Sequence, residues 1–141
     1  MFSRKLTVAA IVAAATVVPV LAFAAPATAP RAAHCVFMEH RVTAVQALRL
    51  TERNGRGTSE RLAGAQVFVQ AEPGLTAEWL QLTVQRHITQ MNSAGMANCP
   101  LDAKDVRVSV ASAGPGFAVN ITGKNTAQAN EILRRAQLLV R

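Results

Sequence analysis

The chain has 141 residues, of which 50% are hydrophobic and 16% are charged. This length suits a single domain, and this composition excludes an intrinsically disordered or low-complexity chain. Aromatic residues make up 4% of the chain, with no Tyr and one Trp, which argues against a nucleic-acid module that stacks bases on aromatic rings.

The N-terminus has the pattern of a secretory signal. Arg4 and Lys5 precede an almost uncharged stretch, residues 6–25, which contains the small-residue triplet Ala22-Phe23-Ala24. A membrane anchor is the alternative, since about 20 apolar residues can span a bilayer. This stretch is rich in Ala and is interrupted by Pro19, so we expect a signal peptide cleaved after Ala24.

Cleavage at this position defines the organisation of the mature protein. We expect a signal peptide over residues 1–24, a flexible leader over 25–33 and a single domain over 34–141, in a periplasmic or secreted protein. Loss of Arg4 and Lys5 lowers the formal net charge from +7 to +5, so the mature chain remains basic.

The first half of the domain predicts two strands and a helix. Residues 42–50 are compatible with a strand or a helix, and the strand is favoured by a small margin because of their Val, Thr and Leu content and the turn-rich segment 54–57 that follows. Residues 65–71 alternate as a strand does. After Pro73-Gly74, Thr76 is the expected N-cap of a helix. The residues that form its buried stripe are Leu80, Val84, His87, Ile88 and Met91. We expect residues 92–100 to form a loop.

The second half predicts a hairpin and a final helix. Residues 106–110 and 117–121 alternate as strands around the turn Gly114-Pro115-Gly116. Asn125 and Gln128 resemble a capping box. The apolar face expected for the last helix consists of Ile132, Leu133, Ala136, Leu139 and Val140.

The resulting order, β-β-α-β-β-α, predicts the α+β class. Two amphipathic helices can cover one face of a four-stranded, mostly antiparallel sheet, as in a ferredoxin-like sandwich or a permutation of it. The other sheet face stays open.

Three segments carry a resemblance to other proteins. They are Gly74-Leu75-Thr76-Ala77-Glu78-Trp79-Leu80, Gly116-Phe117-Ala118-Val119 and Glu131-Ile132-Leu133-Arg134-Arg135-Ala136. The stretch that contains them, residues 73–141, resembles small uncharacterised exported proteins of GC-rich proteobacteria. The resemblance covers about half of the chain and implies the fold and the location, but no activity.

Soft and borderline metal ligands gather in two short windows of the mature chain. The first window holds His34, Cys35, Met38 and His40, and the second holds His87, Met91, Met96 and Cys99. His87 and Met91 are four residues apart on one helix face. If residues 34–40 are extended, then His34, Met38 and His40 share one side.

The donor types favour copper. Thioether sulfur and imidazole nitrogen suit copper and do not depend on free thiols, which an oxidising compartment removes. Zinc is second, with Cys35, Cys99, His87 and a further His as its ligands.

The two cysteines also predict a disulfide. An even number of Cys in an exported domain favours a Cys35–Cys99 bridge, which would bring the two windows together. Such a bridge is compatible with a Met/His copper site but not with a thiolate zinc site. The non-metal interpretation is a core role for Met91 and His87.

Metal binding by an exported protein, with copper as the expected metal, is the first class of function. The second class is a non-catalytic interaction module held by the disulfide. It would use the open sheet face, or the arginines Arg49, Arg53, Arg56 and Arg61, which could meet an anionic envelope surface. A periplasmic protein is a further expected partner, and nucleic acid is not.

We expect no enzymatic activity. The sequence lacks a G-x-S-x-G elbow, an H-E-x-x-H motif, a Walker loop and a C-x-x-C pair. Asp102 and Asp105 are close in sequence, and we expect both to be exposed turn residues.

Overall fold

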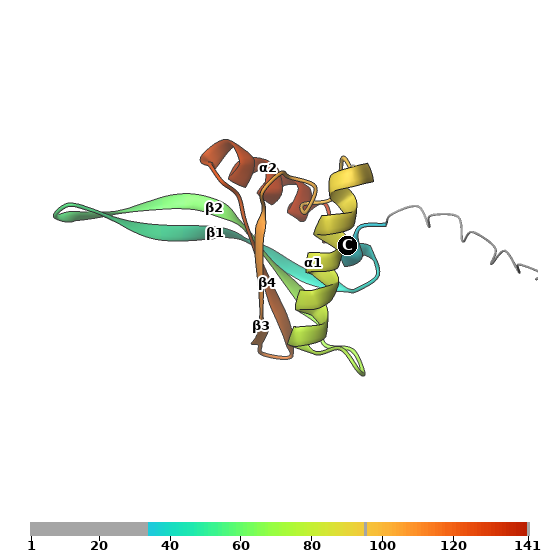
Figure 1. Ribbon diagram of the computed structural model, residues 1–141. Coiled ribbons are helices and arrows are strands. Elements are labelled where there is room, and N and C mark those ends of the chain that lie inside the picture. The colour runs from blue at the N-terminus through green and yellow to red at the C-terminus, as the bar shows by residue number, and fades with distance from the viewer. Residues whose placement is uncertain (1–33, 95, 141) are drawn as a thin grey trace, which may run out of the picture.

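The computed structural model describes residues 34–94 and 96–140, so the expected signal peptide and leader lie outside the described residues. The elements are η1 (Val36–Met38), β1 (Val42–Asn54), β2 (Gly57–Gln70), α1 (Ala77–Ala94), β3 (Arg107–Ala113), β4 (Gly116–Thr122) and α2 (Thr126–Gln137). Apart from the 3-10 helix η1, this is the predicted order (Figure 1). None of the described helices is both long and apolar enough to cross a membrane.

The four strands form one sheet in the order β1-β2-β4-β3, and all neighbouring strands are antiparallel. Strands β2 and β3 are therefore parallel to each other, with β4 between them, and α1 connects them. This is the split β-α-β unit of ferredoxin-like folds. Strand β1 takes the place of the last ferredoxin-like strand, so the predicted α+β sandwich is confirmed, and of the two arrangements considered the structure has the permuted one.

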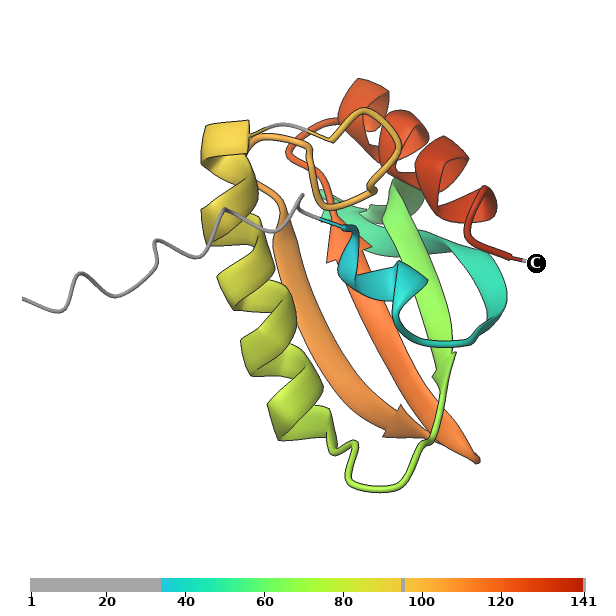
Figure 2. The ribbon, with the colours of Figure 1, turned by 90° about the vertical axis from the view of Figure 1, so that its right-hand side faces the viewer.

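The core lies between the sheet and one layer that contains both helices and η1, which stand in front of the sheet in Figure 2. The two central strands contribute the buried side chains Ala65, Val67, Val69, Phe117, Val119 and Ile121 to this core. The helices contribute Leu80, Val84, Met91, Ile132 and Ala136 to the same core. Burial of this apolar surface is the main stabilising contribution.

The helix caps follow the sequence prediction. The Thr76 hydroxyl accepts a hydrogen bond from the backbone N–H of Trp79 at 3.2 Å. The Asn125 side chain accepts one from the N–H of Gln128 at 2.9 Å. The Gln128 side chain in turn accepts from the N–H of Lys124 at 2.6 Å, which completes a reciprocal cap at the start of α2.

The first two strands are much longer than predicted, and their far ends form an arm. Strand β2 pairs with β4 from Gly64 to Gln70, but it pairs with β1 as far as the turn at Asn54–Gly57. Residues 49–62 therefore project beyond the sheet as a two-stranded ribbon, which we call the arm (Figure 1). Residues 49–60 are all exposed, so no hydrophobic alternation indicates these strands.

Three other boundaries differ from the prediction. Helix α1 continues to Ala94, where a loop was expected from residue 92. Helix α2 ends at Gln137, so Leu139 and Val140 follow the helix. Residues 36–38 form the 3-10 helix η1, and the extended arrangement considered for residues 34–40 is wrong.

Candidate metal centre

A disulfide joins Cys35, directly before η1, to Cys99, in the loop after α1. Their Cα atoms are 5.5 Å apart, and the two residues are separated by 64 positions in the sequence. Both cysteines are buried, with exposed fractions of 3% and 1%. The predicted bridge is confirmed, and it fastens the entry segment to the loop that leaves α1.

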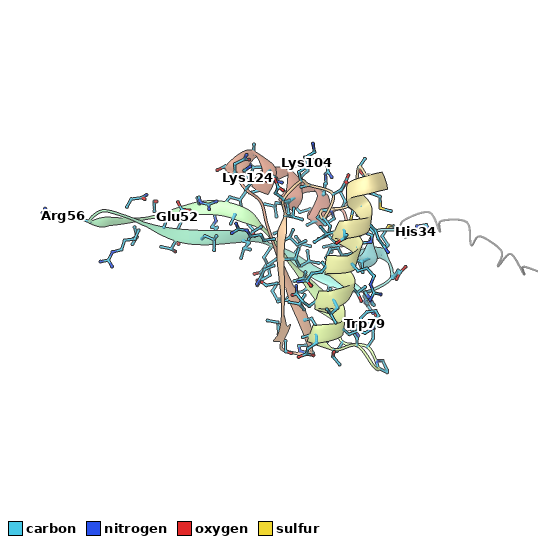
Figure 3. All side chains as sticks on the ribbon, in the orientation of Figure 1. His34, Glu52, Arg56, Trp79, Lys104 and Lys124 are labelled. Carbon is cyan, nitrogen blue, oxygen red and sulfur yellow. A yellow bond between two sulfur atoms is a disulfide. The ribbon has the colours of Figure 1, made fainter. Side chains whose placement is uncertain are left out.

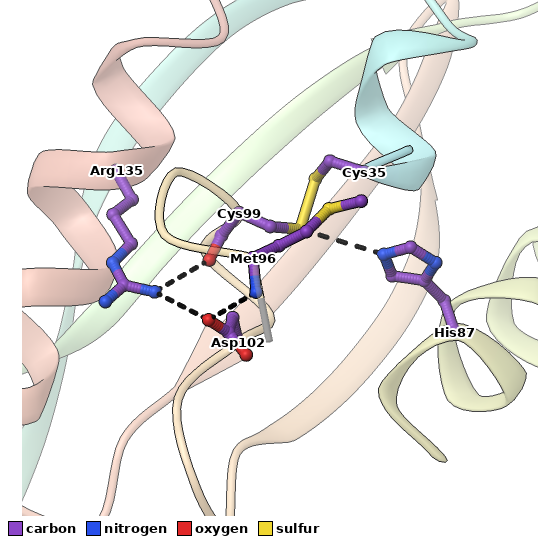
Figure 4. The surroundings of a disulfide bond; sticks show 6 residues. All are labelled: Cys35, His87, Met96, Cys99, Asp102 and Arg135. Carbon is purple, nitrogen blue, oxygen red and sulfur yellow. Dashed lines mark hydrogen bonds and ion pairs between the residues drawn. A yellow bond between two sulfur atoms is a disulfide. The ribbon is translucent and has the colours of Figure 1, made fainter. Parts of the chain in front are cut away.

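His87 faces the disulfide from the buried stripe of α1 (Figure 4). Its Nε2 atom lies 3.8 Å from Sγ of Cys99. Burial lowers the pKa of His87 below 6.5, and the nearby charge of Glu39 offsets part of this effect. The imidazole is therefore neutral at neutral pH, which is the form that binds metal ions.

The donor atoms of Cys35, His87 and Cys99 all lie within 4.8 Å of one another, so this triad could hold a metal ion. Metal binding needs the cysteines as thiolates, because a sulfur bonded to another sulfur has no such charge to offer. The disulfide and a thiolate metal site are thus alternative states of the same two sulfur atoms.

The loop that carries Cys99 is held in place by α2. Nη1 of Arg135 donates to the carbonyl oxygen of Cys99 at 3.2 Å and lies 3.6 Å from Oδ2 of Asp102. The same carboxylate accepts a hydrogen bond from the N–H of Met96 at 2.8 Å. Asp102 is a clamp between loop and helix (Figure 4), with 21% of its side chain exposed, rather than the exposed turn residue expected.

Glu131 completes this network on the helix surface. Its carboxylate accepts hydrogen bonds from Arg134 and Arg135, which lower the pKa of Glu131 to about 2. Arg135 thus has carboxylates on both sides of its guanidinium. Sequence reasoning missed Arg135 and Asp102 as supports of the centre, although the Glu131–Arg135 spacing of four residues signals an ion pair on a helix.

The predicted Met and His ligands fall into two groups. Met96 lies beside the disulfide in Figure 4, and Met38, His40 and Met96 line one cavity of about 710 Å³ together with both cysteines. Residues from both sequence windows therefore meet at this cavity. Leu138 and Leu139, just beyond α2, supply apolar wall on another side.

Three predicted ligands lie apart from this cavity lining: His87, which belongs to the triad, and Met91 and His34. Met91 is 2% exposed and belongs to the hydrophobic core cluster. His34 is exposed at the beginning of the described chain. Neither belongs to the metal-capable triad.

His40 is part of the cavity lining and contacts Glu72 and Trp79. Its side chain is 10% exposed, and Nδ1 lies 3.4 Å from Oε2 of Glu72. The Trp79 ring meets it edge-on, with centroids 6.0 Å apart. Within the described part of the chain, Nε2 is buried and has no hydrogen-bond partner, which leaves a lone donor or acceptor that a ligand could satisfy.

The surfaces proposed for an interaction module are also defined. The open sheet face carries Gln66 and Asn120, and Nε2 of Gln66 donates a hydrogen bond to Oδ1 of Asn120 at 2.7 Å. Arg49, Arg53, Arg56 and Arg61 all lie on the arm, far from the disulfide.

Comparison with known proteins gave no match to a protein-family model, to a curated protein or to a solved structure.

Proposed function

We propose that this is an exported copper-binding protein, in which the Cys35–His87–Cys99 triad holds Cu(I) when the two cysteines are reduced. The single observation that carries the proposal is the convergence of the three donor atoms within 4.8 Å. The supporting loop and helix hold this arrangement in advance, as productive metal sites require.

The donor set favours Cu(I) over Zn²⁺. Two thiolates and one imidazole form a soft three-ligand site, and the Met96 thioether beside the disulfide adds a further soft donor. Zinc in structural sites takes four N or S ligands, and the group found among the described residues has three members.

The disulfide form is the resting state in this proposal. A thiol reductant adds two electrons and two protons to the sulfur–sulfur bond and leaves as its own disulfide. Binding of Cu(I) then displaces the thiol protons and creates the thiolate ligands. The disulfide form and the form with Cu(I) in the triad therefore differ by a two-electron reduction followed by metal binding.

The Met/His ligands predicted from the sequence give the disulfide form a weaker donor set. Met38, Met96 and His40 line the same cavity, and the unpartnered Nε2 of His40 supports a role for this imidazole. We propose that these side chains receive Cu(I) before the thiolates are available, because thioether and imidazole donors do not need reduction.

A competition titration with a chromophoric Cu(I) chelator under anaerobic conditions tests the proposal. We expect the reduced protein to take up about one Cu(I) per chain, and the disulfide form to bind at least about tenfold more weakly. Replacing His87 by Gln should weaken binding by the reduced form. Replacing the exposed His34 by Gln is the matched control and should change nothing.

Two outcomes would contradict the triad as the Cu(I) site. One is equal affinity of the reduced and disulfide forms, and the other is full retention of Cu(I) by a folded His87→Gln protein. The paired substitution Met38→Leu with His40→Gln should remove the weaker binding of the disulfide form while leaving tight binding by the reduced form, because neither residue belongs to the triad.

A further inference from the structure

The arm is a large exposed element that the metal centre does not use. An isolated two-stranded ribbon is marginal in water, and residues 49–60 are exposed along its whole length. The ribbon extends well away from the core, with Arg56 labelled at its tip (Figure 3). The side chains of the arm are therefore accessible to a binding partner.

Cations occupy both faces and the tip of the arm. Residues opposite each other in the ladder share a face, so Arg49 and Arg53, which pair with Leu62 and Thr58, lie on one face. They are about 13 Å apart along the strand. Arg61 lies opposite Leu50 on the other face.

Most of these charges are free to meet an anion. Arg61 forms an ion pair with Glu52, and Glu60 lies opposite Thr51 on the face that carries Arg49 and Arg53. No ion pair within the described residues involves Arg49, Arg53 or Arg56.

A hollow with cationic side chains lies at the base of the arm. This hollow of about 630 Å³ is lined by Leu50 and Arg61 of the arm, by Arg107 at the start of β3, and by Lys124 after β4. Asp105 is the one carboxylate of its lining. The arm and the hollow together carry six cationic side chains and three carboxylates, which favours an anionic ligand.

We propose that the arm and its basal hollow bind an acidic polysaccharide, with the arginines pairing with its carboxylate groups. Arg presents a planar fork of donors that matches a carboxylate. A flexible polyanionic chain can pass from the tip along the ribbon into the hollow and so reach cations on both faces. This binding does not depend on the metal centre.

The form of the arm disfavours two other anionic partners. A flat bilayer reaches one face of the ribbon at a time, and Leu50, 42% exposed, is the arm's one exposed large apolar side chain, so the arm lacks the apolar face of an interfacial anchor. A single-stranded nucleic acid would need aromatic stacking partners, and residues 49–62 contain no aromatic residue.

Binding of the disulfide form to polygalacturonate, followed at several salt concentrations, tests the proposal. The test variant replaces Arg49, Arg53 and Arg56 by Gln. The control replaces the exposed arginines Arg41, Arg86 and Arg134 by Gln and so removes the same charge outside the arm. We expect the apparent Kd to rise about tenfold for the arm variant and less than about twofold for the control, with a smaller salt dependence in the arm variant.

A second variant, with Arg107→Gln and Lys124→Gln, should weaken binding if the chain enters the hollow. Equal losses in the arm variant and the control would show an effect of net charge and overturn the proposal, as would absence of binding by the unaltered protein. Tighter binding to phosphatidylglycerol vesicles or to DNA than to polygalacturonate would overturn the choice of partner.

Discussion

His87 occupies a position in which burial favours its neutral imidazole over the protonated form. Burial lowers its pKa below the unfolded value of 6.5, so the unfolded chain binds a proton more readily than the folded one. Stability must therefore fall as the pH falls through about 6.5, and level off below the folded pKa. Denaturant unfolding of the disulfide form at about pH 8 and about pH 5 should show the lower midpoint at the lower pH.

The His87→Gln protein supplies the control for this titration, because Gln has no charge to gain. Its unfolding midpoint should vary less with pH than that of the unaltered protein between the same two values. An equal pH dependence in both proteins would mean that another group, not His87, is responsible.

At the level of single residues, part of the centre can be predicted from the sequence. The even cysteine count and the helical periodicity place Cys35, Cys99 and His87 together without knowledge of the fold. Met91 shares the stripe of His87, but the stripe spans a range of directions and Met91 falls in the core. Arg135 is 36 positions from Cys99, so its contact with that carbonyl depends on tertiary packing.

Gly64 sets the place where the arm separates from the sheet. A Cβ atom at this position would lie 1.9 Å from the carbonyl oxygen of Ile121, so strands β2 and β4 approach more closely here than any side chain allows. Gly64→Ala should lower the free energy of unfolding by about 3 kcal/mol, because the two strands must move apart. Denaturant unfolding measures this loss.

Gly57, at the other end of β2, is the matched control. The nearest atom to a Cβ at that position is Asn54 O at 3.9 Å, so Gly57→Ala should change stability by less than about 0.5 kcal/mol. Unfolding of Gly64→Ala at the same denaturant concentration as the unaltered protein would be inconsistent with the close approach of β2 and β4.

Among the elements, the sequence predicts the helices and strand segments that bury one face in the core. It does not predict the exposed parts of β1 and β2 that form the arm. Strands β3 and β4 and both helices show apolar periodicity because one side of each lies on the core. The arm has polar side chains on both faces, so its strands lack this signal, and hydrogen bonding between β1 and β2 extends them beyond the apolar segments. The same reasoning explains why the sequence predicts a turn at residues 54–57 but does not predict that this turn ends a long ribbon.

On the scale of the whole molecule, the arm and the sandwich should differ in local stability. The arm has little buried apolar surface, whereas residues 65–69 are paired on both sides and pack under α2. Amide hydrogen exchange should therefore be about 100-fold or more faster in residues 50–60 than in residues 65–69. Similar protection in the two segments would indicate that the arm is covered in solution, for example by a second copy of the chain.

The position of the disulfide in the chain order has a consequence for biosynthesis. The loop that it closes contains β1, β2 and α1, but β4, which completes the centre of the sheet, and α2, which holds the Cys99 carbonyl, both come later. The surroundings that hold Cys99 in place are therefore complete only once the C-terminal segment is present. We expect the native disulfide to be favoured more strongly in the whole chain than in a chain that ends before β4.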